Sequence, residues 1–464
     1  METTPSTQPE VHRELPDFAE WAANLEYESF PKEVLAKARL VLLDDMGAVL
    51  GAGDEPELKA YGQKYLAISS RPEATVLTRG FPMTDRFSAA ELNGMAGCWL
   101  EVDEGYRLAT SHAGIYAIPA LIAVTESQGL TARELLEGLV VGYELAARLA
   151  RAWSFPPLTI HPHGVFSPVG SAVAVAKARG YSTPELTRAI LTASALAVAS
   201  PYNHATRGAL VRNVWTGVGA RLGIMASELA AAEILGLPSS PFDSFGTALH
   251  GERREGALTA GLGETYAIEA GYHKPYACCQ YAHATIDALL ELRSRHESLD
   301  WAREVERIIV ETHPKGLSLD VTHPQTTLGA KFSLPHAVAA GLAYGTGGPQ
   351  AFTRASLADP QVRTLSEAVE LRPIAEVGDW PEDRPSRLTV RLKDGSEDSA
   401  YCATATGDPT KPLSRDDLVE KFVEVTAGTL SPEGARQLAD VILGVPENLA
   451  IRDLVSLVKE KEAA

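Results

Sequence analysis

Apolar residues recur at helical spacing through most of the first part of the chain. Residues 31–46 place apolar side chains at positions i, i+3, i+4 and i+7, and this segment begins with a proline that suits a first helical turn. Thr131 is followed three residues later by Glu134, which is the signature of a capping box, and a similar helix start follows Ser182. Frequent Ala and Gly residues allow the helix backbones to pack closely. The pattern predicts a tight helical bundle over residues 1–272.

The pattern changes to strand-like alternation between residues 273 and 404. Residues 305–312 are β-branched and partly alternating, and residues 387–392 alternate strictly between apolar and polar side chains. Residues 393–396 supply a hairpin turn before a further strand at residues 399–404. We therefore predict an α+β domain that is inserted into a helical protein as a lid.

Residues 405–464 return to a helical pattern. Gly407 and the prolines that follow it break the chain, and Ser414 caps the next helix. We expect these C-terminal helices to pack back on the first domain. The predicted fold class is mainly α, with an all-helical bundle domain and an α+β second domain.

Composition narrows the partners and the compartment. A net charge of −18 disfavours nucleic acid and anionic membranes, because both bind through a basic protein face. The segment Met1–Asp17 lacks the order of a signal peptide, and the most apolar window, residues 189–200, is too short to span a bilayer. The four cysteines have neither zinc-site nor disulfide-framework spacing, which is typical of reduced thiols. We therefore expect a cytoplasmic protein without membrane or nucleic-acid partners.

Titratable residues gather in residues 100–114, between two Ala-rich apolar segments. Glu101, Asp103 and Glu104 precede His112 in this stretch. A charge run is commonly a solvated turn. A loop of acids and a histidine wedged between buried helices is, however, also a place for acid and base chemistry.

A second cluster, His161-Pro-His163, precedes a run of small residues at 170–178. These two histidines are a candidate second wall of the same site. No histidine pair has the i, i+4 spacing of helical metal ligands, so a metal would need both loop histidines and a distant third ligand. The chain also lacks a Gly-x-Ser-x-Gly elbow and a Gly-rich phosphate loop. We therefore expect neither a metal nor a cofactor.

Both clusters belong to a series of short motifs that extends through nearly the whole chain. The motifs are Asn93-Gly, the acidic loop with His112-Ala-Gly, Pro119-Ala-Leu-Ile-Ala, Gly142-Tyr-Glu, Ile160-His-Pro, Gly217-Val-Gly-Ala-Arg-Leu-Gly, Lys274-Pro-Tyr-Ala-Cys, Ala330-Lys-Phe-Ser-Leu-Pro and Gly407-Asp-Pro. Their order and spacing resemble the MmgE/PrpD family, which includes 2-methylcitrate dehydratase, cis-aconitate decarboxylase and iminodisuccinate epimerase.

The resemblance implies roles for particular residues. His112 and His161 fall on histidines of the family's active site and are implied to be catalytic. Lys274 matches a lysine that helps to receive anionic substrate, although a surface lysine at a domain junction would fit the sequence equally well. His163 has no family counterpart and is either a second proton carrier beside the substrate or a loop residue. The resemblance also implies a homodimer that forms through the helical region.

The sequence departs from the family pattern at several pocket positions. Glu101 stands where relatives carry Asp, and Gly105 replaces a Thr, so the substrate contacts made by Glu101 and Asp103 are expected to differ. Arg212 replaces a lysine. Arginine does not shed its proton, but it grips a carboxylate with two parallel hydrogen bonds. His336 replaces a tyrosine, and histidine exchanges protons near neutral pH, so we expect His336 to have taken over proton transfer.

These observations predict a cofactor-independent lyase of the dehydratase or decarboxylase type. It would move a proton α to a carboxylate of a small di- or tricarboxylic acid, with cationic side chains to stabilise the charge that develops. An epimerase of a small dicarboxylate needs acid–base groups on both faces of one carbon, which His161 and His336 could supply. A third alternative is a family member that binds a small acid without turning it over.

Overall fold

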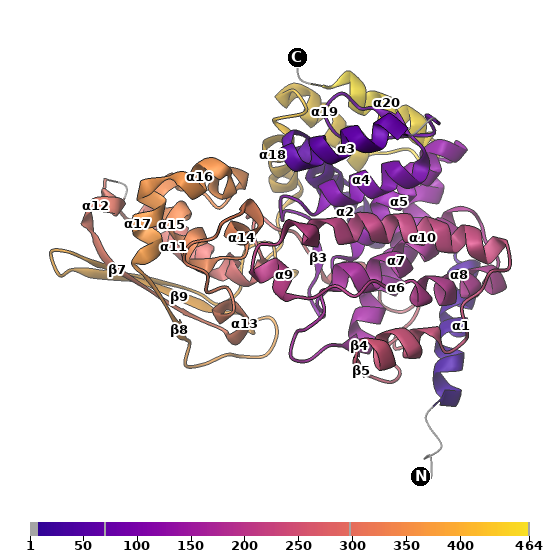
Figure 1. The fold of residues 1–464 in the computed structure, drawn as a ribbon, viewed down its shortest axis with the longest axis horizontal. Helices are drawn as coiled ribbons and strands as arrows, with labels where there is room; N and C mark the ends of the chain where they lie inside the picture. Colours follow the sequence, from indigo (N-terminus) through magenta and orange to yellow (C-terminus); the bar gives the residue numbers. More distant parts are fainter. Residues whose placement is uncertain (1–7, 69–70, 297, 463–464) are drawn as a thin grey trace, which may run out of the picture.

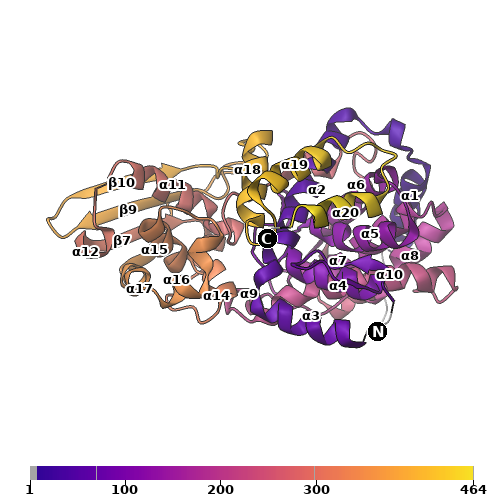
Figure 2. The ribbon, with the colours of Figure 1, turned by 90° about the horizontal axis from the view of Figure 1, so that it is seen from above.

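The computed structural model describes residues 8–68, 71–296 and 298–462. Residues 1–7, where part of the segment without signal-peptide features lies, are outside the described residues. The chain forms two bodies that lie side by side, a larger helical one and a smaller one with a sheet, as Figures 1 and 2 show. This arrangement confirms the predicted fold class of a helical domain with an α+β domain.

The helical domain is a bundle around one central helix. Its helices are α1 (Gln8–Asn24), α2 (Lys32–Gly51), α3 (Pro56–Ile68), α4 (Arg86–Gly97), α5 (Ala113–Gln128), α6 (Ala132–Ala152), α7 (Pro162–Ala178), α8 (Thr183–Ala195), α9 (Asn203–Thr206) and α10 (Trp215–Ala231), with the 3-10 turn η3 (Leu210–Val214) before α10. Every residue of α7 is buried, because α5, α6, α8 and α10 all pack against it. This central position explains why α7 consists of small and apolar residues.

Local signals in the sequence set the starts of these helices as predicted. The backbone N–H of Thr131 donates to Glu134 Oε2 at 2.8 Å, and the N–H of Ser182 donates to Glu185 Oε2 at 2.8 Å. Both capping boxes therefore form and satisfy N–H groups that the helix leaves without partners.

Small residues bring two helices of the bundle into backbone contact. A Cβ atom placed on Gly217 of α10 would lie 2.2 Å from the carbonyl oxygen of Glu91 in α4. A Cβ on Gly94 of α4 would lie 2.7 Å from the Cα of Gly217. Only glycine fits at this crossing, and α10 leads back to η3 and the candidate site.

Short strand pairs tie loops of the helical domain together. They are β1 (Ala74–Thr75) with β2 (Met83–Thr84), β3 (Gly105–Tyr106) with β6 (Gly271–Tyr272), and β4 (Trp153–Ser154) with β5 (Glu252–Arg253). The β3–β6 pair joins the acidic loop to the segment that enters the second domain. No helix in the described residues combines the length and the apolar character needed to cross a bilayer.

The second domain is a four-stranded sheet with helices packed on it. The strands are β7 (Val305–Thr312), β8 (Val369–Pro373), β9 (Ser386–Leu392) and β10 (Glu397–Cys402), and the helices are α11 (His283–Ser294), α12 (Trp301–Glu304), α13 (Pro314–Leu317), α14 (Thr327–Lys331), α15 (Leu334–Tyr344), α16 (Arg354–Ala358) and α17 (Pro360–Glu367). The strand order is β10-β9-β7-β8, with only β7 and β8 parallel. The predicted hairpin joins β9 to β10, and α11 and α15 lie on one side of the sheet (Figure 1).

Three C-terminal helices return to the helical domain. They are α18 (Arg415–Thr426), α19 (Pro432–Leu443) and α20 (Ile451–Glu460). The helices α18 and α19 pack against α2, and α20 packs against α5. In Figure 1 these helices, drawn in yellow, lie on the helical body rather than on the sheet domain.

Candidate active site

A cavity of about 40 Å³ lies where the helical domain meets the second domain. Five of the residues predicted from the sequence line it: Glu101, His112, His161, Arg212 and Lys274. The remaining lining residues are Tyr106, Ala109, Thr110, Ser111, Pro162, Tyr202, Tyr272, Cys279, Gln280, Tyr281, Phe332 and Arg384. Six separate stretches of the chain therefore converge on one small polar space.

The acidic loop is buried rather than solvated. Glu101, Asp103 and Glu104 are each no more than 1% exposed. The loop connects α4 to α5, and β3 fixes its second half against β6. Glu101 has a φ of 59°, which a residue with a side chain adopts only when its surroundings enforce it. The interpretation of this charge run as a surface turn does not hold.

Two buried cations neutralise the acidic side of the cavity. Arg212 forms an ion pair with Glu101, while Lys274 Nζ lies 3.3 Å from Glu101 Oε2 and 3.3 Å from Asp103 Oδ1. Burial alone would favour neutral Lys274, but Asp103 and Glu101 outweigh it and raise the Lys274 pKa. Burial alone would raise the Asp103 pKa, but Lys274 and His112 outweigh burial and lower that pKa. Lys274 and Asp103 therefore both carry their charges.

His112 is the N-cap residue of α5 and is held through one ring nitrogen. Its Nδ1 lies 2.8 Å from Asp103 Oδ2 and 2.8 Å from the carbonyl oxygen of Glu104. Both neighbours are acceptors, so Nδ1 carries the hydrogen and Nε2 holds the lone pair of the neutral ring.

His161 is the N-cap residue of α7 and contacts the other half of the site. Arg212 Nε donates to His161 Nε2 at 3.3 Å, which requires an unprotonated nitrogen there. Burial, together with the positive charge of Arg212, lowers the His161 pKa well below its ordinary value. The ring stacks on Tyr202 with centroids 5.4 Å apart. His161 is thus a neutral and firmly oriented imidazole.

His163 lies behind the two cavity histidines and does not line the cavity. Its ring centroid is 4.3 Å from that of His161 and 5.0 Å from that of His112. Nδ1 pairs with the hydroxyl of Tyr116 at 2.9 Å, and the buried Nε2 has no hydrogen-bond partner among the described residues. Burial and the charge of Arg212 lower its pKa. His163 is placed to contact the cavity histidines, not a substrate in the cavity.

Glu104, between Asp103 and His112, stays out of the ion-pair network. Burial raises its pKa to about 8, even though the N–H of Gly114 donates to Oε1 at 2.6 Å and Tyr143 donates to Oε2 at 3.0 Å. A neutral Glu104 adds no further negative charge beside Asp103. Its hydrogen bonds tie the acidic loop to α5 and α6.

His336 is placed away from this cavity. It lies in the first turn of α15, where its Nε2 pairs with the carbonyl oxygen of Ala351 at 3.0 Å. It lines a separate cleft that shares no residue with the cavity around His161. The structure therefore does not bring His336 to the histidines with which we expected it to act, because Phe332, one turn earlier, occupies that wall.

Arg384 is a cavity residue that the sequence analysis missed. It follows β8 in the second domain, lies over the ring of Tyr281 with 5.0 Å from its guanidinium carbon to the ring centroid, and donates to Gln280. Its buried Nε has no hydrogen-bond partner among the described residues. Nothing in the local sequence marks Arg384, because the residues it meets are about one hundred positions away.

The described residues contain no group of three or more His, Cys, Asp or Glu side chains arranged to hold a metal ion. All four cysteines are buried and unpaired. Burial raises the pKa of the Cys98 thiol to about 12 and that of the Cys279 thiol to about 11. These thiols are therefore neutral and poor nucleophiles at neutral pH.

The fold and the cavity define a two-domain protein with a buried cluster of charged and imidazole side chains at the domain junction. Sequence comparison agrees with this class. The MmgE/PrpD N-terminal domain matches residues 16–248, and the MmgE/PrpD C-terminal domain matches residues 276–445. The chain belongs to the MmgE/PrpD family.

Several characterised relatives share one name. Cis-aconitate decarboxylase of Homo sapiens is 26% identical over 461 residues, which cover 92% of this chain and 90% of the human protein. Cis-aconitate decarboxylase of Aspergillus terreus is 21% identical over 471 residues, covering 95% of each chain. The mouse enzyme of the same name is 25% identical over 448 residues, covering 88% of this chain and 86% of its own.

Proposed function

We propose that this protein is a lyase that decarboxylates a small tricarboxylic acid related to cis-aconitate, by proton transfer and without a metal or an organic cofactor. The observation that carries the proposal is the convergence of His112 and His161 on one cavity with three cations. The names of the relatives support the reaction type. The two histidines support proton transfer.

The cations of the cavity differ in how free they are to bind a polyanionic substrate. Arg212 and Lys274 are already balanced by Glu101 and Asp103. Arg384 enters from the second domain; its Nε makes no hydrogen bond to the described residues and lies 3.5 Å from Asp383 Oδ2, so a substrate carboxylate could take up this guanidinium in place of that long ion pair. Charge-assisted hydrogen bonds of this kind bind and orient a carboxylate strongly.

Proton transfer follows from the states of the two histidines. When the bond between carbon and a carboxylate breaks, carbon dioxide leaves and the electron pair stays on the substrate carbon skeleton. A protonated imidazole must then supply a proton to carbon. His112, held by Asp103, is the proposed donor of that proton to carbon, and neutral His161 is the proposed group through which a proton from water returns to the site before the next turnover.

Substrate entry requires the cavity to widen. Its volume of about 40 Å³ is close to that of one water molecule, which takes roughly 30 Å³ in the liquid. Because Arg384, Gln280 and Tyr281 come from the second domain, outward motion of that domain enlarges the cavity. The second domain would then act as a lid that closes over bound substrate.

Product analysis in deuterated water tests the proposal. Cis-aconitate, citrate, 2-methylcitrate and small dicarboxylates are incubated with the protein and followed by NMR. We expect loss of carbon dioxide and one deuterium on carbon in the product. Deuterium exchange without loss of mass would favour epimerisation, loss of water would favour a dehydratase, and binding without exchange would favour the non-catalytic alternative. Full activity after exhaustive chelation is expected, and recovery of lost activity by a divalent ion would contradict it.

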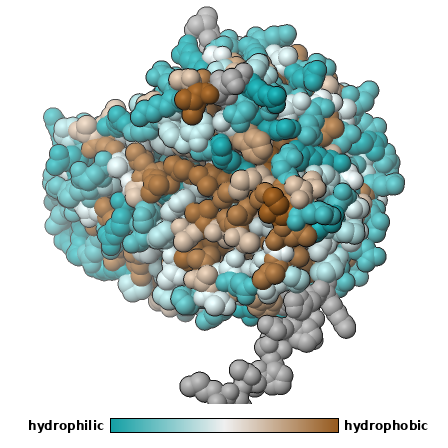
Figure 3. Space-filling model, turned by 45° about the vertical axis from the view of Figure 1, so that its right-hand side comes forward, coloured by the Kyte–Doolittle hydropathy of each residue, from teal (hydrophilic) through white to brown (hydrophobic). Residues whose placement is uncertain are grey.

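We also propose that two chains associate through the helical domain. A continuous apolar area covers part of the helical face in Figure 3. Exposed apolar patches of this extent commonly mark protein interfaces. A symmetric dimer would bury the patch of both copies and leave the second domain free to move.

A further inference from the structure

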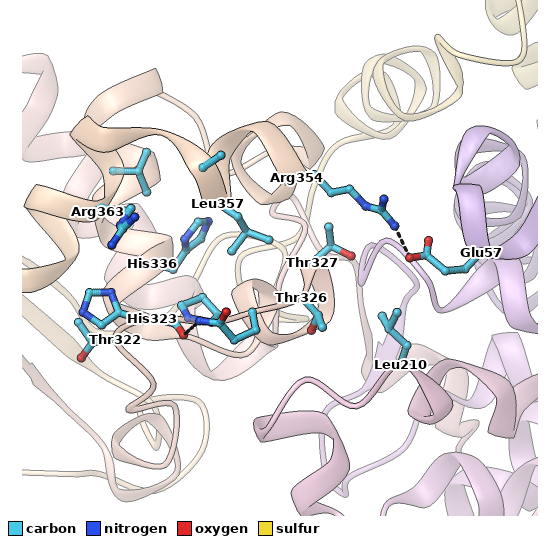
Figure 4. A pocket seen from close by; sticks show the side chains of 14 residues that line it. Glu57, Leu210, Thr322, His323, Thr326, Thr327, His336, Arg354, Leu357 and Arg363 are labelled. Atoms are coloured by element: carbon cyan, nitrogen blue, oxygen red, sulfur yellow. Dashed lines mark hydrogen bonds and ion pairs between the residues drawn. The ribbon is translucent and has the colours of Figure 1, made fainter.

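A second and larger cleft lies at the domain junction, away from the histidine cavity. Its volume is about 490 Å³. Figure 4 shows Glu57 of α3 and Leu210 of η3 on the helical side, facing residues of the second domain. The cleft is lined by Glu57, Leu210, Thr322, His323, Pro324, Gln325, Thr326, Thr327, His336, Arg354, Leu357, Ala358, Val362 and Arg363. None of these residues lines the cavity around His161.

The polar side chains of the cleft favour a negatively charged ligand. Arg354 and Arg363 lie at opposite ends of the view in Figure 4, and His323 and His336 lie near Arg363. Glu57, the one carboxylate among the lining residues, is paired with Arg354, and Glu367, outside the lining, lies 3.6 Å from His323 Nε2. The Arg363 guanidinium makes no hydrogen bond or ion pair with the described residues, and only the backbone N–H of Arg363 is bonded, to the Asp359 carbonyl oxygen at 3.1 Å. Guanidinium groups bind carboxylates through two parallel hydrogen bonds, so the end of the cleft at Arg363 offers an unused anion site.

The remaining wall favours a ligand with a carbon skeleton over a bare inorganic anion. Leu210, Leu357 and Val362 give the cleft an apolar side. The hydroxyls of Thr322 and Thr327 add neutral hydrogen-bonding groups. A few polar groups on an apolar wall are typical of small-molecule sites, and the volume is sufficient for a di- or tricarboxylate.

We propose that this cleft binds a second small polycarboxylate, which regulates the enzyme from outside the catalytic cavity. The cleft touches both domains and is connected to the catalytic site. Leu210 begins η3, the same turn that carries Arg212. Thr326 Oγ1 donates to the carbonyl oxygen of Gly208 at 2.7 Å, two residues before Leu210. A ligand held here contacts η3 and the second domain together, so it favours the closed arrangement of the two domains.

Calorimetric titration with citrate tests the site on the full-length protein. Arg363→Gln removes the unpaired guanidinium from an exposed position, so the fold should persist. We expect this variant to lose one citrate site or to bind it about 10-fold more weakly, the size of one charge-assisted hydrogen bond. Arg372→Gln, which replaces an exposed arginine on β8 outside the cleft, is the matched control and should bind as wild type.

A second variant occludes the cleft without removing charge. Ala358→Trp, at an exposed position, should abolish the same citrate site. Unchanged affinity and stoichiometry in both Arg363→Gln and Ala358→Trp would overturn the proposal. So would loss of all citrate binding in Arg384→Gln, because every bound citrate would then occupy the catalytic cavity.

A separate kinetic measurement tests whether citrate in this cleft regulates the enzyme. Citrate at saturating concentration should change the KM for the substrate by a larger factor in wild type and in Arg372→Gln than in Arg363→Gln, where only competition in the catalytic cavity remains. An identical citrate effect in Arg363→Gln would contradict regulation from this cleft. Binding is measured as heat, so the site stands or falls independently of the proposed decarboxylation.

Discussion

At the scale of single residues, the state of His161 depends on Arg212, although the two residues come from different turns of the chain. Arg212 is held by Glu101, and it in turn keeps His161 Nε2 unprotonated. The arginine replaces the lysine of the family pattern, and an arginine does not take part in proton exchange. In the proposed mechanism, proton transfer on this side of the cavity therefore involves His161 and not Arg212.

His161→Gln should lower kcat/KM by about 100-fold or more, because general acid–base groups contribute on that order. Glutamine keeps a polar side chain at the N-cap of α7, so the thermal unfolding midpoint should change little. Rates and thermal unfolding are measured for His161→Gln and for a control variant, His250→Gln. The control replaces an exposed histidine that is distant from His161 in the sequence. A folded His161→Gln variant with wild-type activity would remove His161 from the mechanism.

Arg384→Gln should act mainly on substrate binding. The Nε of Arg384 makes no hydrogen bond to the described residues and only a long ion pair of 3.5 Å with Asp383 Oδ2, so the guanidinium can turn to a substrate carboxylate. We expect KM to rise about 10-fold or more, as for the loss of one charge-assisted hydrogen bond, with a smaller change in kcat. Steady-state kinetics of Arg387→Gln, an exposed arginine on β9, provide the comparison. Equal KM values for all three proteins would exclude Arg384 from substrate binding.

At the scale of helices and strands, close helix packing governs the stability of the bundle. The helices α4 and α10 cross at Gly94 and Gly217, where side chains have no room. The same two helices lead directly into the acidic loop and out of η3. Their spacing therefore also sets the position of Glu101 relative to Arg212.

Gly217→Ala should destabilise the fold by about 1–3 kcal/mol, since the added methyl group meets backbone and forces the helices apart. Gly62→Ala in α3 is the matched control. Its Cβ would have no neighbour nearer than 4.0 Å, and alanine is the better helix former by about 1 kcal/mol. Urea unfolding should rank Gly62→Ala at or above wild type and Gly217→Ala below it. The reverse order would contradict the packing described for α4 and α10.

Buried histidines make the stability of the whole molecule depend on pH. Burial, with a contribution from Lys274, lowers the pKa of His283 to about 3, and burial lowers that of His313 to about 4. Unfolded histidine takes up a proton near pH 6.5, whereas these folded ones do not. The stability that each contributes is present above pH 6.5 and is lost as the pH falls toward the folded pKa.

His283→Gln should reduce this loss of stability. As the pH falls below 6, the free energy of unfolding of the wild type should decrease faster than that of the variant. The difference between the two slopes should be about 1.4 kcal/mol per pH unit. The glutamine amide can keep the hydrogen bond to the Cys278 carbonyl oxygen, which His283 Nε2 makes at 3.2 Å. Urea unfolding at pH 6.5, 5.5 and 4.5 measures both slopes, with His250→Gln as control. Parallel slopes for wild type and His283→Gln would show that His283 is not held neutral.

Assembly is the second property that belongs to the whole molecule. One chain has a mass of 49.6 kDa, so sedimentation equilibrium should give about twice that value at micromolar concentration. Burial of the apolar area in Figure 3 is the physical reason. A mass of a single chain under these conditions would contradict the proposed dimer.

Local interactions explain what the sequence could determine about this protein. Capping at Thr131 and Ser182, the period of the helices and the hairpin between β9 and β10 depend on residues within a few positions of one another. These patterns predicted a helical domain followed by an α+β domain. The order of the motifs predicted the family, and through it the candidate roles of His112 and His161.

Long-range packing decided the rest. The acidic loop is buried because β6 and α5 cover it, and no property of Glu101 or Asp103 alone distinguishes this from a solvated turn. Arg384 reaches the cavity, and His336 lines a different cleft, because the fold of the second domain places them there. Sequence by itself determined the elements and the kind of chemistry available. Only contacts between residues far apart in the chain decided which titratable groups share one low-dielectric space. These contacts therefore also decided the charges and the partners of those groups.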